Sequence, residues 1–195
     1  MTENLHNFSF PVLNRPWLCF DLETTGLTQW DDVLQLTAID DKNQVINEYF
    51  NGRRQKKWKK AEEVNHISPL MVKDKLSFYE RREEFKALFK KYPVVIGYNV
   101  GFDVKGVYHG IYHHIEYYSA IIDVFHLWKA FKKKHNIETE NNKLTTVAAY
   151  FGYDFSAVAH DSYEDVYATI FVFSKILEDD EFLEECMLVS KGEMI

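Results

Sequence analysis

The fold is decided by the stretch Trp17–Leu27, which reads WLCFDLETTGL. Its apolar run between Pro16 and Gly26 is typical of a strand that is buried on both faces. Side chains alternate along a strand, so we expect Asp21 and Glu23 on the same face, about 7 Å apart. Two poorly solvated carboxylates on one face repel each other, and the pair is therefore unfavourable unless a divalent cation lies close to both.

The chemistry of the acids favours particular ions. A cluster of carboxylate oxygens favours Mg²⁺ or Mn²⁺ over zinc. For an isolated Asp-x-Glu pair, the alternative is a strand end at which both acids simply reach water. Two later segments of the chain also carry acids, and they favour the metal site.

A second acid follows another short strand. Residues 93–97 form an apolar run rich in β-branched side chains, and Asn99 is suited to cap a helix that begins near Val100. This places Phe102 and Asp103 in the first turn, where the helix dipole alone would favour an acid. The end of a buried parallel strand is also where open α/β sheets place their ligands, which favours a functional Asp103.

The third segment, HDSYED, begins with His160. Asp161 and Glu164 fit a capping box, so a helix is predicted over about 162–177. Asp165 lies at the edge of the apolar stripe of that helix, and His160 precedes the cap, so both can approach one point from different elements. A solitary histidine at a helix start is more often structural or exposed, and only the acids favour a catalytic role.

In this order, the segments DLETTGL, YNVGFD and HDSYEDVYAT resemble the three exonuclease motifs of the DEDD superfamily, in its histidine-bearing, DnaQ-like branch. That branch includes the proofreading epsilon subunit of bacterial DNA polymerase III, ribonuclease T and oligoribonuclease. The segments VNHISPLMV and TTVAAYFGYD resemble stretches between the motifs, and the likeness covers about residues 16–178. Tyr98 replaces a common histidine, and residues 65–67 replace an HGI pattern, which affects nucleotide contacts more than the acids.

The resemblance implies the function and the catalytic residues. Its expected reaction is metal-dependent 3′–5′ exonuclease hydrolysis of phosphodiester bonds at nucleic-acid 3′ ends, which releases nucleoside 5′-monophosphates and favours DNA over RNA. Two Mg²⁺ or Mn²⁺ ions would be held by four acids, Asp21, Glu23, Asp103 and Asp165. His160 would take a proton from the attacking water, because an unperturbed imidazole is partly neutral at pH 7.

Substrate contacts follow from the same motifs. The resemblance implies that Thr24 contacts the terminal nucleotide, that Leu27 wedges against its base, and that Asn99 and Phe102 line the pocket. For Leu27 and Phe102 the alternative is core packing. The expected substrates are single-stranded or frayed 3′ ends of DNA or RNA, and a DNA polymerase or repair protein is the candidate partner. Proofreading, repair and RNA trimming stay open, and the rival function is a non-catalytic nucleic-acid-binding or polymerase-interaction module.

Composition sets broad limits. The 195 residues, 46% of them hydrophobic, predict one exonuclease domain with a core over about 16–178, a lead-in over 1–15 and a tail over 179–195. The formal charge of −7 argues against binding nucleic acid over a broad surface, although an exonuclease needs only a few nucleotides. Residues 53–60, RRQKKWKK, could follow a phosphate backbone and stack a base on Trp58, or form a solvated loop.

The predicted compartment is the cytoplasm. Cys19 and Cys186 are too few for a disulfide framework, so a reducing compartment is expected. The sequence contains no signal peptide and no apolar run long enough to cross a bilayer, so no membrane contact is expected.

The order of elements predicts an α/β fold. Strands are expected near 17–22, 32–40, 44–50, 93–97 and 119–123. Helices are expected near 61–67, 69–74, 78–91, 100–113, 124–134, 143–151 and 162–177. Three strands joined by short turns and then two strands alternating with helices indicate a mixed five-stranded sheet flanked by helices. The resemblance implies that this sheet is ribonuclease H-like.

Overall fold

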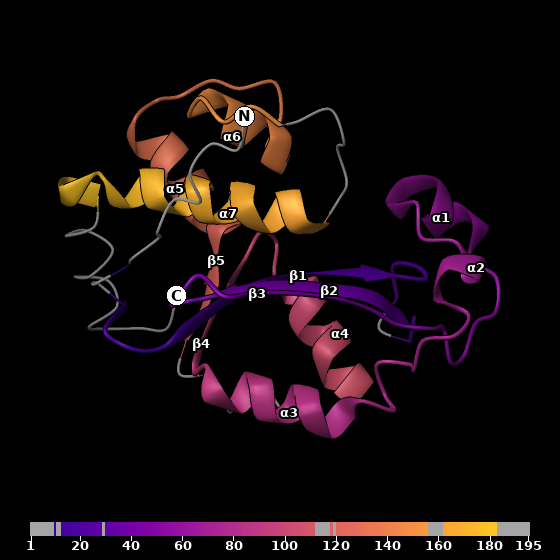
Figure 1. Ribbon diagram of the computed structural model, residues 1–195. Helices are drawn as coiled ribbons and strands as arrows, with labels where there is room; N and C mark the ends of the chain where they lie inside the picture. Colours follow the sequence, from indigo (N-terminus) through magenta and orange to yellow (C-terminus); the bar gives the residue numbers. More distant parts are fainter. Residues whose placement is uncertain are drawn as a thin grey trace, which may run out of the picture.

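The chain forms a mixed five-stranded sheet with helices on both faces, as predicted (Figure 1). The computed structural model describes residues 10, 13–28, 30–111, 118, 120–155 and 162–182. The strands are β1 (Trp17–Thr24), β2 (Val33–Asp40), β3 (Val45–Tyr49), β4 (Val94–Gly97) and β5 (Ala120–Asp123). The helices are α1 (Lys59–Asn65), α2 (Pro69–Val72), α3 (Arg82–Lys91), α4 (Gly101–Ile111), α5 (Val124–Lys134), α6 (Leu144–Tyr150) and α7 (Ser162–Leu177).

Strand β1 lies in the centre of the sheet, whose order is β3-β2-β1-β4-β5. It pairs antiparallel with β2, and β2 pairs antiparallel with β3, so the first three strands form the predicted meander. On its other side β1 pairs in parallel with β4, from Trp17–Val94 to Cys19–Ile96. Because β1 continues to Thr24, its acidic half extends beyond the residues paired with β4.

The two faces of β1 are buried in separate cores. Trp17 and Cys19 belong to the core formed with α5, α6 and α7, whereas Leu18 and Phe20 belong to the core formed with α3 and α4. In Figure 1, α5, α6 and α7 lie above the sheet, and α3 and α4 lie below it. The prediction of a strand buried on both faces is therefore confirmed, and the odd-numbered acids of β1 share a face with Cys19.

The basic segment 53–60 has a buried centre. Trp58 is only 4% exposed, packs with Leu34 and Ile67, and donates its indole N–H to the carbonyl of Ile67 at 2.6 Å. The indole is therefore not available to stack a base. The six basic side chains around it remain on the surface, consistent with a solvated segment.

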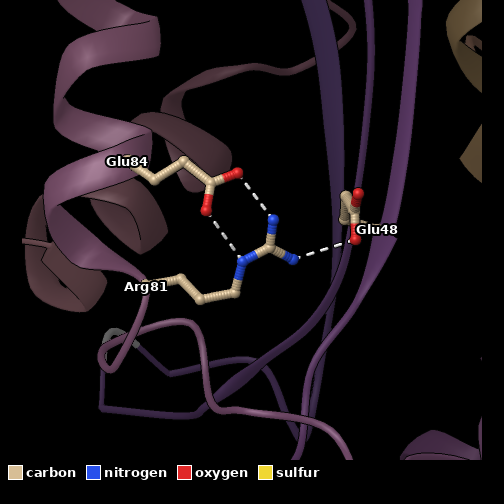
Figure 2. A network of polar contacts seen from close by, with 3 residues as sticks. All are labelled: Glu48, Arg81 and Glu84. Carbon is tan, nitrogen blue, oxygen red and sulfur yellow. Dashed lines mark hydrogen bonds and ion pairs between the residues drawn. The ribbon is translucent and has the colours of Figure 1, made fainter.

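Helix α3 begins later than predicted, at Arg82 rather than residue 78. Ser77 donates its N–H and its hydroxyl to the carboxylate of Glu80, at 2.8 and 2.7 Å, which closes a separate turn before the helix. Figure 2 shows how Arg81 then joins this end of α3 to β3. Its guanidinium donates to Glu84 at 2.6 and 3.0 Å and to Glu48 at 2.9 Å. Both acids raise the pKa of Arg81.

The other boundaries agree with the predictions to within about two residues. Helix α1 begins at Lys59 and α4 at Gly101, and residues 112 and 113 at the predicted end of α4 lie outside the described residues. None of the helices in the described part of the chain has the length and apolar character needed to cross a bilayer.

Candidate active site

The central part of the site is formed by β1, β2 and α7. Asp21 on β1 lies directly opposite Thr37 on β2, so both side chains share one face. The hydroxyls of Thr37 and Ser162 are hydrogen-bonded at 2.6 Å in a buried position. This bond fixes the start of α7 over the pair of facing residues Asp21 and Thr37. Asp165 lies in the first turn of the same helix and is thereby brought toward β1.

Asp103 approaches β1 from another direction. Its side chain is buried, and its Oδ1 accepts the backbone N–H of Leu22 at 3.2 Å. The first turn of α4 is therefore attached to β1 beyond the residues that pair with β4. The turn between β4 and α4 is tight, because a Cβ on Gly97 would lie 2.6 Å from Val100 Cγ2 and 3.1 Å from the carbonyl oxygen of Phe20.

The electrostatics show that the predicted acids act on one another. Burial raises the pKa of Asp21 well above its usual range, and the charges of Asp103, Glu23 and Asp165 raise it further. Burial also raises the pKa of Asp103 to about 8, although N–H groups of Leu22 and of Asp103 itself oppose this shift. Such shifts are typical of functional sites, because an uncompensated acid in a buried position is unfavourable.

The four acids are suited to a divalent cation by their chemistry, although they do not enclose one in this geometry. Within residues 10–182, excluding the segments that the structure does not describe, no three His, Cys, Asp or Glu side chains form a group that could hold an ion as it stands. Mutual repulsion opposes closer approach of the carboxylates. Cation binding would therefore require rotation of the carboxylates toward one another, with release of that repulsion.

Two of the predicted substrate residues line an open groove of about 360 Å³, which is formed by Leu27, Thr28, Trp30, Phe102 and Lys105. Leu27 is 91% exposed, so core packing does not explain it. Phe102 is half-buried and belongs to none of the core clusters among the described residues. The structure therefore brings both side chains to one surface, and Phe102 directly precedes Asp103 in α4.

Thr24 and Asn99, two further predicted residues, lie at the same end of the sheet. Thr24 ends β1, and its carbonyl accepts the side-chain amide of Asn65 at 3.2 Å, so the segment that replaces the HGI pattern contacts the site. Asn99 is exposed and has a φ of 57°, whereas an N-cap residue has an extended backbone. The prediction that Asn99 caps the start of α4 is therefore wrong. His160 and the capping residue Asp161 lie outside the described residues.

Three residues near the site were not singled out from the sequence. Asp123 ends β5 and accepts the N–H of Asn99 at 2.9 Å, which braces the turn before α4. An acid at the end of a parallel strand was the signal that could have found it. Trp30 and Lys105 line the groove, and an indole on a surface loop is the only sequence signal for them.

Tyr98, the departure in the second motif, has a structural role. Its hydroxyl donates to the carbonyl of Asn142 at 2.5 Å, and its ring packs edge-on against Phe125. Burial raises the pKa of the phenol, which therefore remains protonated and able to donate. Tyr98 thus ties the end of β4 to the segment before α6.

The sheet and the acids of its central strand define an α/β protein of the ribonuclease H-like class. Residues 18–173 match the RNase_T family, described as Exonuclease, and the chain belongs to this family. The exonuclease prediction is thereby confirmed at the level of the family. The assignment to the histidine branch stays a prediction.

Solved exonucleases share the fold. Exonuclease I from Methylocaldum szegediense superposes with a TM-score of 0.73 at 19% identity, over 86% of this chain and 41% of that chain. E. coli exonuclease I in complex with a dT13 oligonucleotide gives a TM-score of 0.74 at 21% identity, over 89% of this chain and 43% of that chain. The chain thus spans less than half the length of these exonuclease I structures.

A smaller exonuclease has nearly the same extent as this chain. Exonuclease X in complex with 5′ overhanging duplex DNA superposes with a TM-score of 0.65 at 14% identity, over 85% of this chain and 93% of that chain. At such identities the likeness establishes the fold alone. No curated protein sequence matches this chain.

Proposed function

We propose that this chain is a metal-dependent 3′–5′ exonuclease that hydrolyses phosphodiester bonds at nucleic-acid 3′ ends and releases nucleoside 5′-monophosphates, with DNA favoured over RNA. One observation carries the proposal. The pKa of Asp21 is raised by burial and further by the charges of Asp103, Glu23 and Asp165, which come from three different elements of a chain in an exonuclease family. Such a convergence of acids is costly without a catalytic use.

The four acids, Asp21, Glu23, Asp103 and Asp165, would hold two Mg²⁺ or Mn²⁺ ions. Bound divalent ions lower the pKa of water and neutralise charge that develops on phosphate oxygens during an in-line displacement. The protein contributes the positions of the carboxylates. The N–H of Leu22 orients Asp103, and the Thr37–Ser162 hydrogen bond holds the first turn of α7, which carries Asp165.

His160 would act as the general base. A neutral imidazole nitrogen accepts the proton of the water that attacks phosphorus, so no covalent intermediate is needed. An unperturbed imidazole has a pKa near 6.5 and is therefore largely neutral at pH 7. The proposed position, just before α7, would let the imidazole and Asp165 act on the same reacting group.

The proposed substrate is a single-stranded or frayed 3′ end. Thr24 would contact the terminal nucleotide, Leu27 would wedge against its base, and Asn99 and Phe102 would line the pocket. The groove shared by Leu27 and Phe102 supports this assignment. DNA is favoured because structural neighbours include exonucleases in complex with a dT13 oligonucleotide and with 5′ overhanging duplex DNA. A DNA polymerase or repair protein is the proposed partner, and the cytoplasm the proposed compartment.

A nuclease assay tests the proposal directly. A 5′-labelled single-stranded oligonucleotide is incubated with the protein and Mn²⁺ or EDTA, and matched DNA and RNA strands, single and double, are compared. We expect stepwise shortening from the 3′ end that EDTA abolishes and that is faster on DNA. Asp74→Asn, which removes an exposed acid outside the three motifs, is the matched control for loss of charge and should cleave normally.

The second candidate is a nucleic-acid-binding or polymerase-interaction module that retains the fold without catalysis. It is favoured by one observation, because the described side chains do not form a ready group of three metal ligands. In the same assay this candidate predicts an unchanged labelled strand in Mn²⁺ together with retained binding. The two functions are thereby separated by a single experiment.

A further inference from the structure

The groove beside the acids contains two residues to which the proposed mechanism gives no role. Trp30 is 60% exposed, although it is a large apolar side chain, and Lys105 is exposed on α4. Both line the groove together with Leu27 and Phe102. Exposed apolar side chains that gather next to a positive charge are typical of a binding surface.

We propose that Trp30 and Lys105 form a subsite for the nucleotide that precedes the 3′-terminal one in a single strand. The indole stacks on the base, and the ammonium group of Lys105 pairs with a backbone phosphate. This inference rests on the proposed exonuclease function. According to this inference, the same groove binds a second nucleotide. The protein would therefore prefer strands whose bases are free to stack.

The position of Trp30 favours the second nucleotide over the terminal one. Leu27 is the proposed wedge against the terminal base, and Trp30 lies farther along the same loop. Its ring packs against His109, with the ring centroids 5.0 Å apart. His109 is six residues after Asp103 on α4, about 9 Å along the helix axis by the rise per residue. The indole is thus displaced from the acids, on the far side of Leu27 in the chain.

The loop that carries Trp30 is braced before any ligand binds. Asp31 accepts the N–H and the hydroxyl of Thr28, both at 2.7 Å. The carbonyl of Trp30 accepts the guanidinium of Arg54 at 3.0 Å. Because the loop is already held, stacking a base requires little additional ordering, which favours binding.

The same contacts connect the groove to the basic segment 53–60. Asp32 accepts the backbone N–H groups of Arg54 and Gln55, at 2.6 and 3.0 Å. The guanidinium of Arg54 is therefore held at the backbone of Trp30, and Lys105 lines the same groove as the indole. The exposed ammonium group of Lys105 can pair with a phosphate here even though Asp31 and Asp32 lie on the same loop and the whole chain has a formal charge of −7.

The test compares two substrates in Mn²⁺. Thymidine 5′-monophosphate p-nitrophenyl ester offers one nucleotide, whereas a short oligothymidylate offers the neighbouring nucleotide as well. We expect Trp30→Ala to lower kcat/KM for the oligothymidylate roughly 5- to 100-fold, as loss of one stacked base should, and to leave the ester unchanged. Trp30→Phe should retain most of the activity, because it keeps an aromatic face.

Lys105→Gln tests the phosphate contact. It should reduce the slope of log(kcat/KM) against log salt by about 0.7 for the oligothymidylate, the value for one phosphate contact on a single strand. Lys143→Gln removes an exposed lysine before α6 and should leave the slope unchanged. An unchanged slope in Lys105→Gln, or equal losses on both substrates in Trp30→Ala, would overturn the subsite.

A binding measurement separates this inference from the proposed function. If the wild-type protein cleaves neither substrate, the exonuclease proposal fails. The subsite is then judged by fluorescence anisotropy of labelled oligothymidylate in EDTA, where Trp30→Ala should weaken binding by the same roughly 5- to 100-fold. Binding equal to that of the wild type would overturn the subsite whatever the catalytic result.

Discussion

Asp40 and Asp103 are both buried acids, one at the end of β2 and the other in the first turn of α4, yet their surroundings differ. Asp40 is 2% exposed and accepts three hydrogen bonds, from the N–H groups of Lys42 and Gln44 at 2.9 and 2.8 Å and from the hydroxyl of Tyr92 at 2.6 Å. These donors fix the hairpin between β2 and β3. The charge of Asp40 is thereby compensated, and the role of this acid is structural.

Asp103 is 5% exposed and lies among other acids. Burial, together with the charges of Glu23 and Asp123, raises its pKa to about 8. The N–H groups that it accepts do not offset these effects. The comparison with Asp40 teaches that burial alone does not distinguish the two acids, and that the proposed role of Asp103 rests on burial together with neighbouring negative charge.

The largest expected effect breaks the acidic cluster itself. Asp21→Ala should abolish detectable cleavage, because it removes a proposed metal ligand shared by the cluster. The free energy of unfolding in EDTA should stay unchanged or rise, since one source of repulsion is lost. Oligonucleotide cleavage and the melting temperature in EDTA check both parts. A large fall in that melting temperature would mean that Asp21, like Asp40, is a structural acid.

The next effect concerns the base that would act beside the acids. His160→Ala should slow cleavage by roughly 10² to 10⁴, as loss of a general base does. Binding of Mn²⁺ and of the oligonucleotide should remain close to that of the wild type, because the acids are intact. Single-turnover rates across pH measure the loss. Rates near those of the wild type would remove His160 from the mechanism.

Asp40, the acid whose charge is compensated, should respond to substitution in the opposite way to Asp21. Asp40→Ala leaves the hydroxyl of Tyr92 and the N–H groups of the hairpin without their acceptor, and should lower the free energy of unfolding by about 2–3 kcal/mol. Cleavage by the folded protein should persist, since Asp40 lies away from the predicted ligands. Urea unfolding and an assay well below the melting temperature test this contrast. Loss of cleavage without loss of stability would reverse the roles given to the two acids.

Local features of the sequence predicted much of this arrangement. The alternation in Trp17–Leu27 predicted a buried strand with two acids on one face, and β1 has that form. The helix predicted over 162–177 is α7, and Val166, Ile170 and Phe173 of its apolar stripe are buried. These features depend on residues close in the chain, which is why periodicity and helix-start signals could find them.

Contacts between distant residues could not be predicted in this way. The bond from the Leu22 N–H to Asp103 depends on where the pairing of β1 with β4 stops. The burial of Trp58 depends on Ile67, which accepts its indole N–H from beyond α1. The residue types alone show that segment 53–60 is basic and contains an aromatic side chain. Only the packing of the folded chain determines that Trp58 faces inward. Tertiary context thus governs which polar and aromatic side chains remain available to a ligand.

A further test sharpens the comparison through pH. In the folded, metal-free protein the pKa of Asp103 is about 8, against an ordinary value of 3.8, so the folded state binds more protons than the unfolded state between these values. Stability should therefore fall as pH rises from about 4 to 8. Melting temperatures in EDTA should show this decline, and Asp103→Asn should flatten it. Mn²⁺ should restore stability most at the upper end of this window, where protons no longer compete for the carboxylate. A melting temperature that rises over the window in EDTA would show that Asp103 is compensated in the manner of Asp40.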